Sequence, residues 1–222
     1  MKNTLYYQLS AVDAIEVSFD SQFDFLYDEI FKDEVYKKAF EGFSKKKDLT
    51  IIDLGANIGM FSIYAYPYAK TIYAIEPFSK NRRNLIANIK KNKLDNVIVS
   101  DVAISDYKET ALMYATDDNL VGAKIVRPPF ADPAPVTEVV STMTLAQFMD
   151  SNKIDHVDIL KVDIEGEELH VFNSPDFKDA SLKIDRIIGE HFADEVNPIL
   201  DTCGFKTSII NDSYFYAQSK YE

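Results

Sequence analysis

The stretch Thr50–Pro77 constrains the fold of this chain more than any other. It opens with TIIDLG, a short β-branched apolar run that ends in an acid and a glycine. Such a run predicts a buried strand that leads into a tight turn. Apolar residues at helical spacing follow until Pro67, and a second apolar run, TIYAIEP, ends at Glu76 before a proline. Strand, glycine turn, helix, strand and terminal acid together are typical of a nucleotide-binding βαβ unit, in which the acid can bond ribose hydroxyls.

The spacing of the glycines indicates which nucleotide the turn can hold. A dinucleotide fingerprint would place glycines at positions 55, 57 and 60, where the backbone must approach a pyrophosphate, but this chain has Gly55, Asn57 and Met60 there. Asp53, directly before the turn, would repel a phosphate and attract a cation. S-adenosylmethionine has no phosphate and carries an ammonium, a sulfonium and a ribose diol, so Asp53 and Glu76 suit it. The alternative is a generic strand–helix turn whose glycines only permit close packing, which would leave both acids unexplained.

Composition limits the compartment and the partners. The 222 residues are enough for one domain with a substantial core. The single cysteine, Cys203, cannot pair within the chain, which favours a reducing compartment. The sequence shows neither a signal-peptide pattern nor an apolar run of transmembrane length, so we expect a soluble, cytoplasmic protein without a membrane partner. A net charge of −12 opposes a nucleic-acid surface, and we expect a small neutral or cationic molecule, or a protein, as partner.

Residues 1–48 precede the nucleotide-binding unit. From Ser21 onward their aromatic and aliphatic residues recur at helical spacing, which predicts amphipathic helices. We therefore expect an N-terminal helical extension over residues 1–48 that packs on a Rossmann-like domain over residues 49–222, the two forming one structural domain. Packing of the apolar helix faces on the sheet is the simpler interpretation, and a lid that closes over substrate is the alternative.

The remainder of the chain alternates strand and helix patterns. Apolar runs end near Asp101, at Asp163, and at Glu190 and His191, and a terminal hairpin follows around Asn211. The pattern predicts an α/β fold with a doubly wound sheet of seven strands. Residues 105–142 interrupt it with two extended segments, ETALMYAT and VTEVVSTM, around a proline-rich loop, NLVGAKIVRPPFADPAP. We interpret this excursion as the mouth of the site, where specificity would reside; a surface hairpin without a role is an equal alternative.

Six stretches together resemble the FkbM family of S-adenosylmethionine-dependent methyltransferases: IIDLGANIGMFS, AIEPF, DVAISD, STMTLAQFM, LKVDIEGEE and IIGEHF. The resemblance implies a class I methyltransferase fold, with a seven-stranded sheet whose last strand is antiparallel. It also implies O-methylation of a hydroxyl on a sugar or another small metabolite. The acceptor and the methylated atom stay open, with an N-methyltransferase as one alternative. A non-catalytic S-adenosylmethionine-binding or regulatory subunit is another.

The candidate catalytic residues are Asp163, Glu190 and His191, because all three follow strands at the edge where ligands bind in such sheets. Histidine has the unperturbed pKa best suited to general-base catalysis near neutral pH. With Glu165, these three residues could also gather a divalent metal, but their spacing is not diagnostic and we predict none. For the cofactor we expect contacts from Asp53, Gly55, Ala56, Asn57, Ile58, Gly59, Phe61, Ser62, Glu76, Pro77, Phe78, Asp101, Val102, Ala103 and Asp163.

Overall fold

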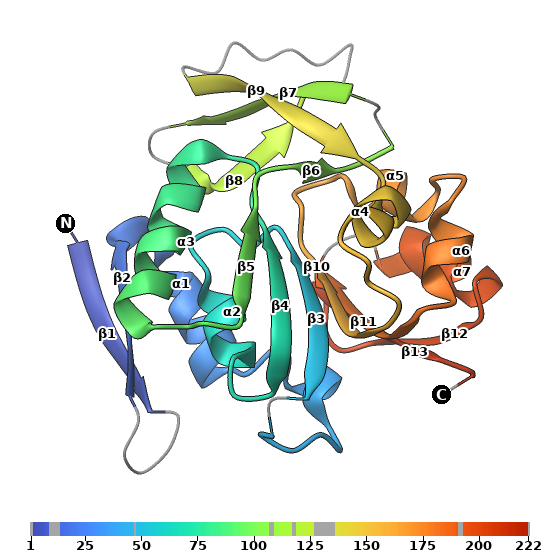
Figure 1. Cartoon of the computed structure of the whole chain (residues 1–222), viewed down its shortest axis with the longest axis horizontal. Helices are drawn as coiled ribbons and strands as arrows, with labels where there is room; N and C mark the ends of the chain where they lie inside the picture. Colours follow the sequence, from blue (N-terminus) through green and yellow to red (C-terminus); the bar gives the residue numbers. More distant parts are fainter. Residues whose placement is uncertain are drawn as a thin grey trace.

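A seven-stranded sheet forms the centre of the computed structural model, which describes residues 2–8, 14–46, 48–106, 109–116, 119–126, 136–190 and 193–221 (Figure 1). Its strand order is β12-β13-β11-β10-β3-β4-β5. Strands β10, β11, β3, β4 and β5 pair in parallel, whereas β13 runs antiparallel to both of its neighbours. This confirms the predicted class I sheet with an antiparallel last strand. The strands span β3 Leu49–Leu54, β4 Ala69–Ile75, β5 Val97–Ser100, β10 Val157–Val162, β11 Ile184–Glu190, β12 Phe205–Ile209 and β13 Tyr214–Ser219.

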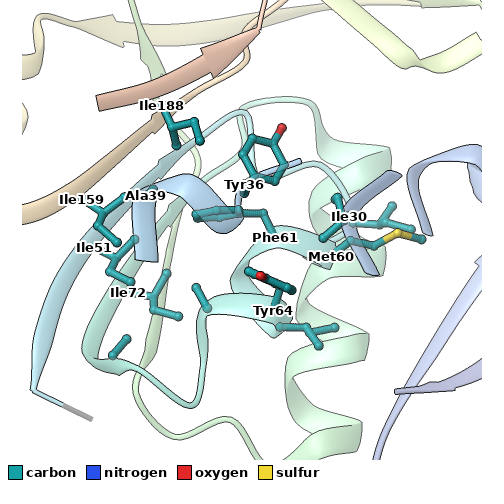
Figure 2. Packing of buried hydrophobic residues seen from close by; sticks show 14 of the residues in the cluster. Ile30, Tyr36, Ala39, Ile51, Met60, Phe61, Tyr64, Ile72, Ile159 and Ile188 are labelled. Atoms are coloured by element: carbon teal, nitrogen blue, oxygen red, sulfur yellow. The ribbon is translucent and has the colours of Figure 1, made fainter. Parts of the chain in front are cut away.

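Both faces of this sheet are buried, as expected for parallel strands. Ile51 and Ile52 are neighbours on β3, point to opposite faces, and are both fully buried. The face with Ile51 packs against α2 and the N-terminal segment, where Phe61, Tyr36 and Ile159 meet (Figure 2). The other face packs against the later helices. The helices are α2 Met60–Ala65, α3 Ser79–Asn92, α4 Leu145–Ser151, α5 Glu168–Phe172, α6 Phe177–Ser181 and α7 Ala193–Thr202.

The N-terminal segment corrects one prediction. Two strands, β1 Lys2–Gln8 and β2 Ala14–Asp20, form an antiparallel pair, so the expected helical extension is wrong for these residues. The sequence AIEVSFD alternates apolar and polar residues with the period of a strand. Short helical turns follow: η1 Ser21–Phe23, α1 Asp24–Tyr27, η2 Asp28–Lys32 and η3 Lys37–Phe40. Their apolar side chains join the cluster over α2, and Figure 2 shows Ile30 beside Met60.

A second sheet lies across the end of the central sheet at which β3, β4 and β10 finish (Figure 1). Its strands are β6 Ala103–Ile104, β7 Glu109–Thr116, β8 Asn119–Ile125 and β9 Val136–Met143, in the order β6-β9-β7-β8. The two predicted extended segments are therefore confirmed as β7 and β9. The prediction that NLVGAKI belongs to the loop is wrong, because β8 pairs with β7 and buries Leu120. The proline-rich residues 127–135 lie outside the described residues.

The helices can be compared in length and hydropathy with a helix that spans a membrane. None of those in the described ranges is long and apolar enough to cross a bilayer.

Candidate active site

The site begins at the turn between β3 and α2. Gly55, Asn57 and Gly59 all have positive φ, at 74°, 52° and 92°. A Cβ on Gly55 would lie 1.8 Å from the backbone oxygen of Asp163, at the end of β10. Only glycine permits this approach. The turn therefore lies directly against the end of the neighbouring strand, and the two form one continuous backbone surface.

Glu76, at the end of β4, connects the same turn to the next strand. Its carboxylate is 4% exposed and accepts hydrogen bonds from the backbone N–H groups of Asn57 and Phe78, both at 2.8 Å. Burial raises the pKa of Glu76 to about 8, although the two backbone hydrogen bonds act in the opposite direction. Each carboxylate oxygen has a second lone pair, so Glu76 can still accept from hydroxyl groups of a ligand.

A buried lysine lies beneath the turn. The Lys161 ammonium donates to the carbonyl oxygens of Gly55 at 2.8 Å and Leu54 at 3.1 Å. It also lies 3.3 Å from Asp53 Oδ1 and 3.4 Å from Asp163 Oδ2. Burial lowers the pKa of Lys161, but the carboxylates of Asp163 and Asp53 outweigh burial and raise it overall. Lys161 is therefore a charged group at the floor of the site, which the sequence analysis did not identify.

Asp53 is fully buried in this arrangement. Its Oδ2 accepts a hydrogen bond from the Ser62 hydroxyl at 2.7 Å. Burial raises the pKa of Asp53, opposed by the charge of Lys161 and the bond from Ser62. The partners of Asp53 are therefore Ser62 and Lys161. Asp53 itself is not on the cavity wall described next.

The turn, Glu76 and Lys161 border a cavity of about 180 Å³ at the carboxyl ends of β3, β4, β10 and β11. Further lining comes from β7, β8 and the N-terminal segment, and the acidic residues Asp163 and Glu190 also lie on the wall. The lining from β7, β8 and the N-terminal segment includes Glu29 and Tyr36, and its other members are apolar: Phe25, Leu26, Ile30, Met113, Val121, Ala123 and Ile125.

Comparison with known proteins decides the family. The model of the methyltransferase FkbM domain matches residues 53–207. The chain belongs to the FkbM family of methyltransferases. It is 27% identical to the 31-O-demethyl-FK506 methyltransferase FkbM of Streptomyces tacrolimicus, over 66% of each chain, and 28% identical to the methyltransferase sdnD of Sordaria araneosa, over 77% of this chain and 72% of that one. It also matches 11% of the AMB antimetabolite synthetase AmbE of Pseudomonas aeruginosa, with 26% identity over 89% of this chain.

Solved structures agree on the fold. The methyltransferase FkbM from Methylobacillus flagellatus KT superposes with a TM-score of 0.53 at 16% identity, over 90% of this chain and 56% of that one. The precorrin-6y C5,15-methyltransferase from Geobacter metallireducens GS-15 superposes with a TM-score of 0.52 at 12% identity, over 84% of this chain and 88% of that one. The class I methyltransferase architecture is thereby established for this FkbM-family chain.

S-adenosylmethionine is the cofactor of this FkbM-family enzyme, and the residues present fit it. Glu76 offers buried acceptor oxygens to a ribose diol, and Gly55 lets the turn pack against the Asp163 backbone so that both line the same cavity. The buried Asn57 Oδ1 has no hydrogen-bond partner within the described ranges and can accept from a ligand donor. The turn lacks the glycines that a pyrophosphate would require.

The cavity brings together many of the sequence-predicted residues of this FkbM-family site. Those on its wall are Gly55, Ala56, Asn57, Ile58, Phe61, Glu76, Pro77, Ala103, Asp163 and Glu190. Asp53, Ser62 and Phe78 are buried behind the wall, and Gly59 begins α2 as its N-cap. After β5, Asp101 is exposed and Val102 half-buried, and neither is on the wall. His191 lies outside the described residues.

A second group of titratable side chains lies at the opposite end of the central sheet. It consists of His156, Asp158 and Asp185. Within the described part of the chain, this is the group of three possible metal-ligating side chains whose ligand atoms all lie within 4.8 Å of one another. His156 Nε2 is 3.1 Å from Asp185 Oδ2 and 3.5 Å from Asp158 Oδ1, and Asp158 also accepts from the Thr50 N–H at 2.7 Å. Hydrogen bonding between neighbouring strand starts accounts for this group, which is remote from the cavity.

Proposed function

We propose that this FkbM-family enzyme transfers a methyl group to a hydroxyl oxygen of a small metabolite, such as a sugar. The observation that carries the proposal is one cavity whose wall combines the glycine turn and Glu76, apolar residues of β7, β8 and the N-terminal segment, and the acidic residues Asp163 and Glu190. The name of the S. tacrolimicus relative also supports it, because that name describes methylation of 31-O-demethyl-FK506.

The chain's own residues position the acceptor and manage its proton. S-adenosylmethionine supplies the electrophilic methyl group when it is bound. Asp163 directly follows β10 and Glu190 is the last residue of β11. The two strands are paired, with Val162 opposite Gly189. Two carboxylates at one edge give an acceptor hydroxyl a hydrogen-bond acceptor that can also take up its proton. Orientation alone can supply effective molarities of roughly 10⁵ M or more, so a base adds to a large positioning effect.

Tyr36 is not the base in this mechanism. Its side chain is buried on the cavity wall, and burial raises its pKa well above the ordinary value, with the charges of Asp163 and Glu190 acting in the same direction. The phenol therefore stays protonated near neutral pH and can donate a hydrogen bond to the acceptor. His191 remains a candidate base from the sequence, beside Asp163 and Glu190.

The acceptor is expected to be a small molecule rather than a nucleic acid, in line with the net charge of −12. A cytoplasmic location fits the single cysteine. Residues 49–222 are proposed to act as the methyltransferase domain. Residues 1–48 would contribute acceptor-side wall through the segment that carries Phe25 and Tyr36.

The test is a product assay with matched acceptors. Purified protein, S-adenosylmethionine and a library of hydroxylated compounds, each paired with its amino analogue, are followed by S-adenosylhomocysteine release and by mass spectrometry of the acceptor. We expect product from hydroxyl compounds, with release reduced in Asp163→Asn. Product only from the amino analogues would replace this proposal with N-methylation. Tight cofactor binding with no product from any acceptor would favour a binding subunit.

A further inference from the structure

Lys161 occupies an unusual place for a charged side chain. It lies in the middle of β10, opposite Asp53 in the register with β3. Side chains of paired residues point to the same face of a sheet, and this face is otherwise apolar, with Ile51, Ile159 and Phe61 in one cluster. Lys161 is 3% exposed and Asp53 fully buried. A lysine without partners would not remain charged there.

The ammonium is surrounded by oxygens of the cofactor turn and its neighbouring strand end. It donates to the carbonyls of Leu54 and Gly55 and pairs with the carboxylates of Asp53 and Asp163. Its Nζ also lies 6.0 Å from the centroid of the Phe61 ring, within the range of a cation–π contact. The ammonium has three N–H donors and four oxygen neighbours. Its charge and hydrogen bonds therefore hold these four groups close together.

A purely structural role does not account for this arrangement. Buried ion pairs are often no more stabilising than well-packed apolar residues of similar volume. One carboxylate would suffice to neutralise Lys161, yet a second, Asp163, is shared with it and is partly exposed on the cavity wall. The Gly55 carbonyl and the Asp163 carboxylate would repel each other without a cation between them.

We propose that Lys161 is a positioning residue for methyl transfer, holding the Gly55 carbonyl and the Asp163 carboxylate in the arrangement that binds the cofactor. The inference rests on the proposed function, in which the turn and Asp163 border the cofactor and the acceptor. Lys161 acts through these two groups. Its removal therefore weakens cofactor binding even where the fold is preserved.

Three variants separate positioning from folding. Lys161→Met leaves Asp53 as an unpaired buried carboxylate and is expected to lower stability. The double variant Lys161→Met/Asp53→Asn removes both charges and is expected to recover stability in urea unfolding. Titration calorimetry with S-adenosylhomocysteine as the probe then compares it with Asp53→Asn alone. We expect binding at least about tenfold weaker in the double variant, since displacement of the turn or of Asp163 would remove about one hydrogen bond to the cofactor, which corresponds to about that factor.

Arg186→Met is the matched control. Arg186 lies on β11 opposite Ile159, is buried, and donates to the carbonyls of Ala39 and Glu41 at 3.0 and 2.7 Å. Its guanidinium lies 4.0 Å from the centroid of the Phe43 ring. This variant also removes a buried cation with two carbonyl bonds, but away from the cavity wall. It should lose stability while its affinity for S-adenosylhomocysteine stays within about twofold.

The outcomes divide cleanly. A double variant that binds S-adenosylhomocysteine as tightly as Asp53→Asn would overturn the inference and leave the proposed function standing. Failure of both Lys161 variants to fold would also overturn it, because a structural role would then be sufficient. Absence of S-adenosylhomocysteine binding by the wild-type protein would overturn both proposals together.

Discussion

Glu76 links cofactor binding to pH in a way that can be measured. Its carboxyl group is buried and held by two backbone N–H groups. Burial raises its pKa from 4.5 to about 8. In the unfolded chain the pKa is near the ordinary value, so the folded protein binds more protons between these two pH values. By linkage, the stability from this group is complete below about pH 4.5 and is lost as pH rises through about 8.

The magnitude follows from the pKa change. At about 1.4 kcal/mol for each pH unit, the full effect is about 5 kcal/mol in the free energy of unfolding. Glu76→Gln keeps the size of the side chain and removes its titration. Between about pH 5 and pH 9, we expect the wild-type protein to lose about 3–5 kcal/mol more stability than this variant. Groups that titrate in both proteins cancel in the comparison.

Folding favours the protonated form of Glu76, whereas cofactor binding should favour its ionised form. Ribose hydroxyls donate to the ionised carboxylate, so binding below about pH 8 releases a proton from Glu76. The affinity for S-adenosylhomocysteine should therefore rise toward pH 8, by up to about tenfold per pH unit. In Glu76→Gln we expect weaker affinity without this rise. Urea unfolding and titration calorimetry over a pH series test both effects, and parallel curves for the two proteins would refute the reasoning.

Three further predictions concern the turn, the base and the acceptor wall. Gly55→Ala combines a positive φ with the clash against the Asp163 carbonyl and should cost at least about 3 kcal/mol in urea unfolding. Gly42→Ala, where φ is also positive but nothing lies within 4 Å, should cost about 1–2 kcal/mol; equal losses would contradict the clash. Asp163→Asn should lower single-turnover rates by about 10²–10⁴-fold if Asp163 is the base, whereas full activity would leave that role to His191 or Glu190. Ala123→Phe should raise the acceptor KM and leave the Kd for S-adenosylhomocysteine within about twofold, because Ala123 is on the β8 wall; a loss of cofactor affinity instead would move this wall to the cofactor side.

The proposed cofactor half of the site was accessible from the sequence because its determinants are local. The turn and Glu76 belong to one βαβ unit, in which a short segment specifies strand, turn and strand end. The hydrogen bond from the Asn57 N–H to Glu76 spans 19 residues. Local patterns of this kind survive folding unchanged, and the predicted strand ends at Glu76, Asp163 and Glu190 accordingly meet at one edge of the sheet.

Lys161 was missed because its meaning depends on strand register. Its hydrogen bonds to Gly55 and Leu54 span 106 and 107 residues. In the sequence it is one lysine in the run ILKVD, and nothing local indicates that Asp53 lies opposite. The signal that could have identified Lys161 is a lysine within an apolar strand, since a charge in a strand buried on both faces requires a partner. The β1–β2 strand pair was missed for a different reason: the helical spacing after residue 20 was extended to the residues before it, where the sequence alternates as a strand does.

The individual residues of the proposed acceptor wall could not be named from the sequence, although residues 105–142 were expected to form the mouth of the site. They come from segments that are separate in the chain. Phe25, Met113 and Val121 come from the N-terminal segment, β7 and β8, and each looks like an ordinary core residue in its own pattern. The second sheet is a separate ladder from the central one, and β6 joins it by pairing with β9. Substitutions on β7 and β8 can therefore reshape the acceptor wall without disturbing the Gly55–Asp163 contact or Lys161 beneath it. In such an arrangement, the residues that bind the cofactor can stay the same while the wall from β7 and β8 changes. Methyltransferases of one family could differ in acceptor in this way.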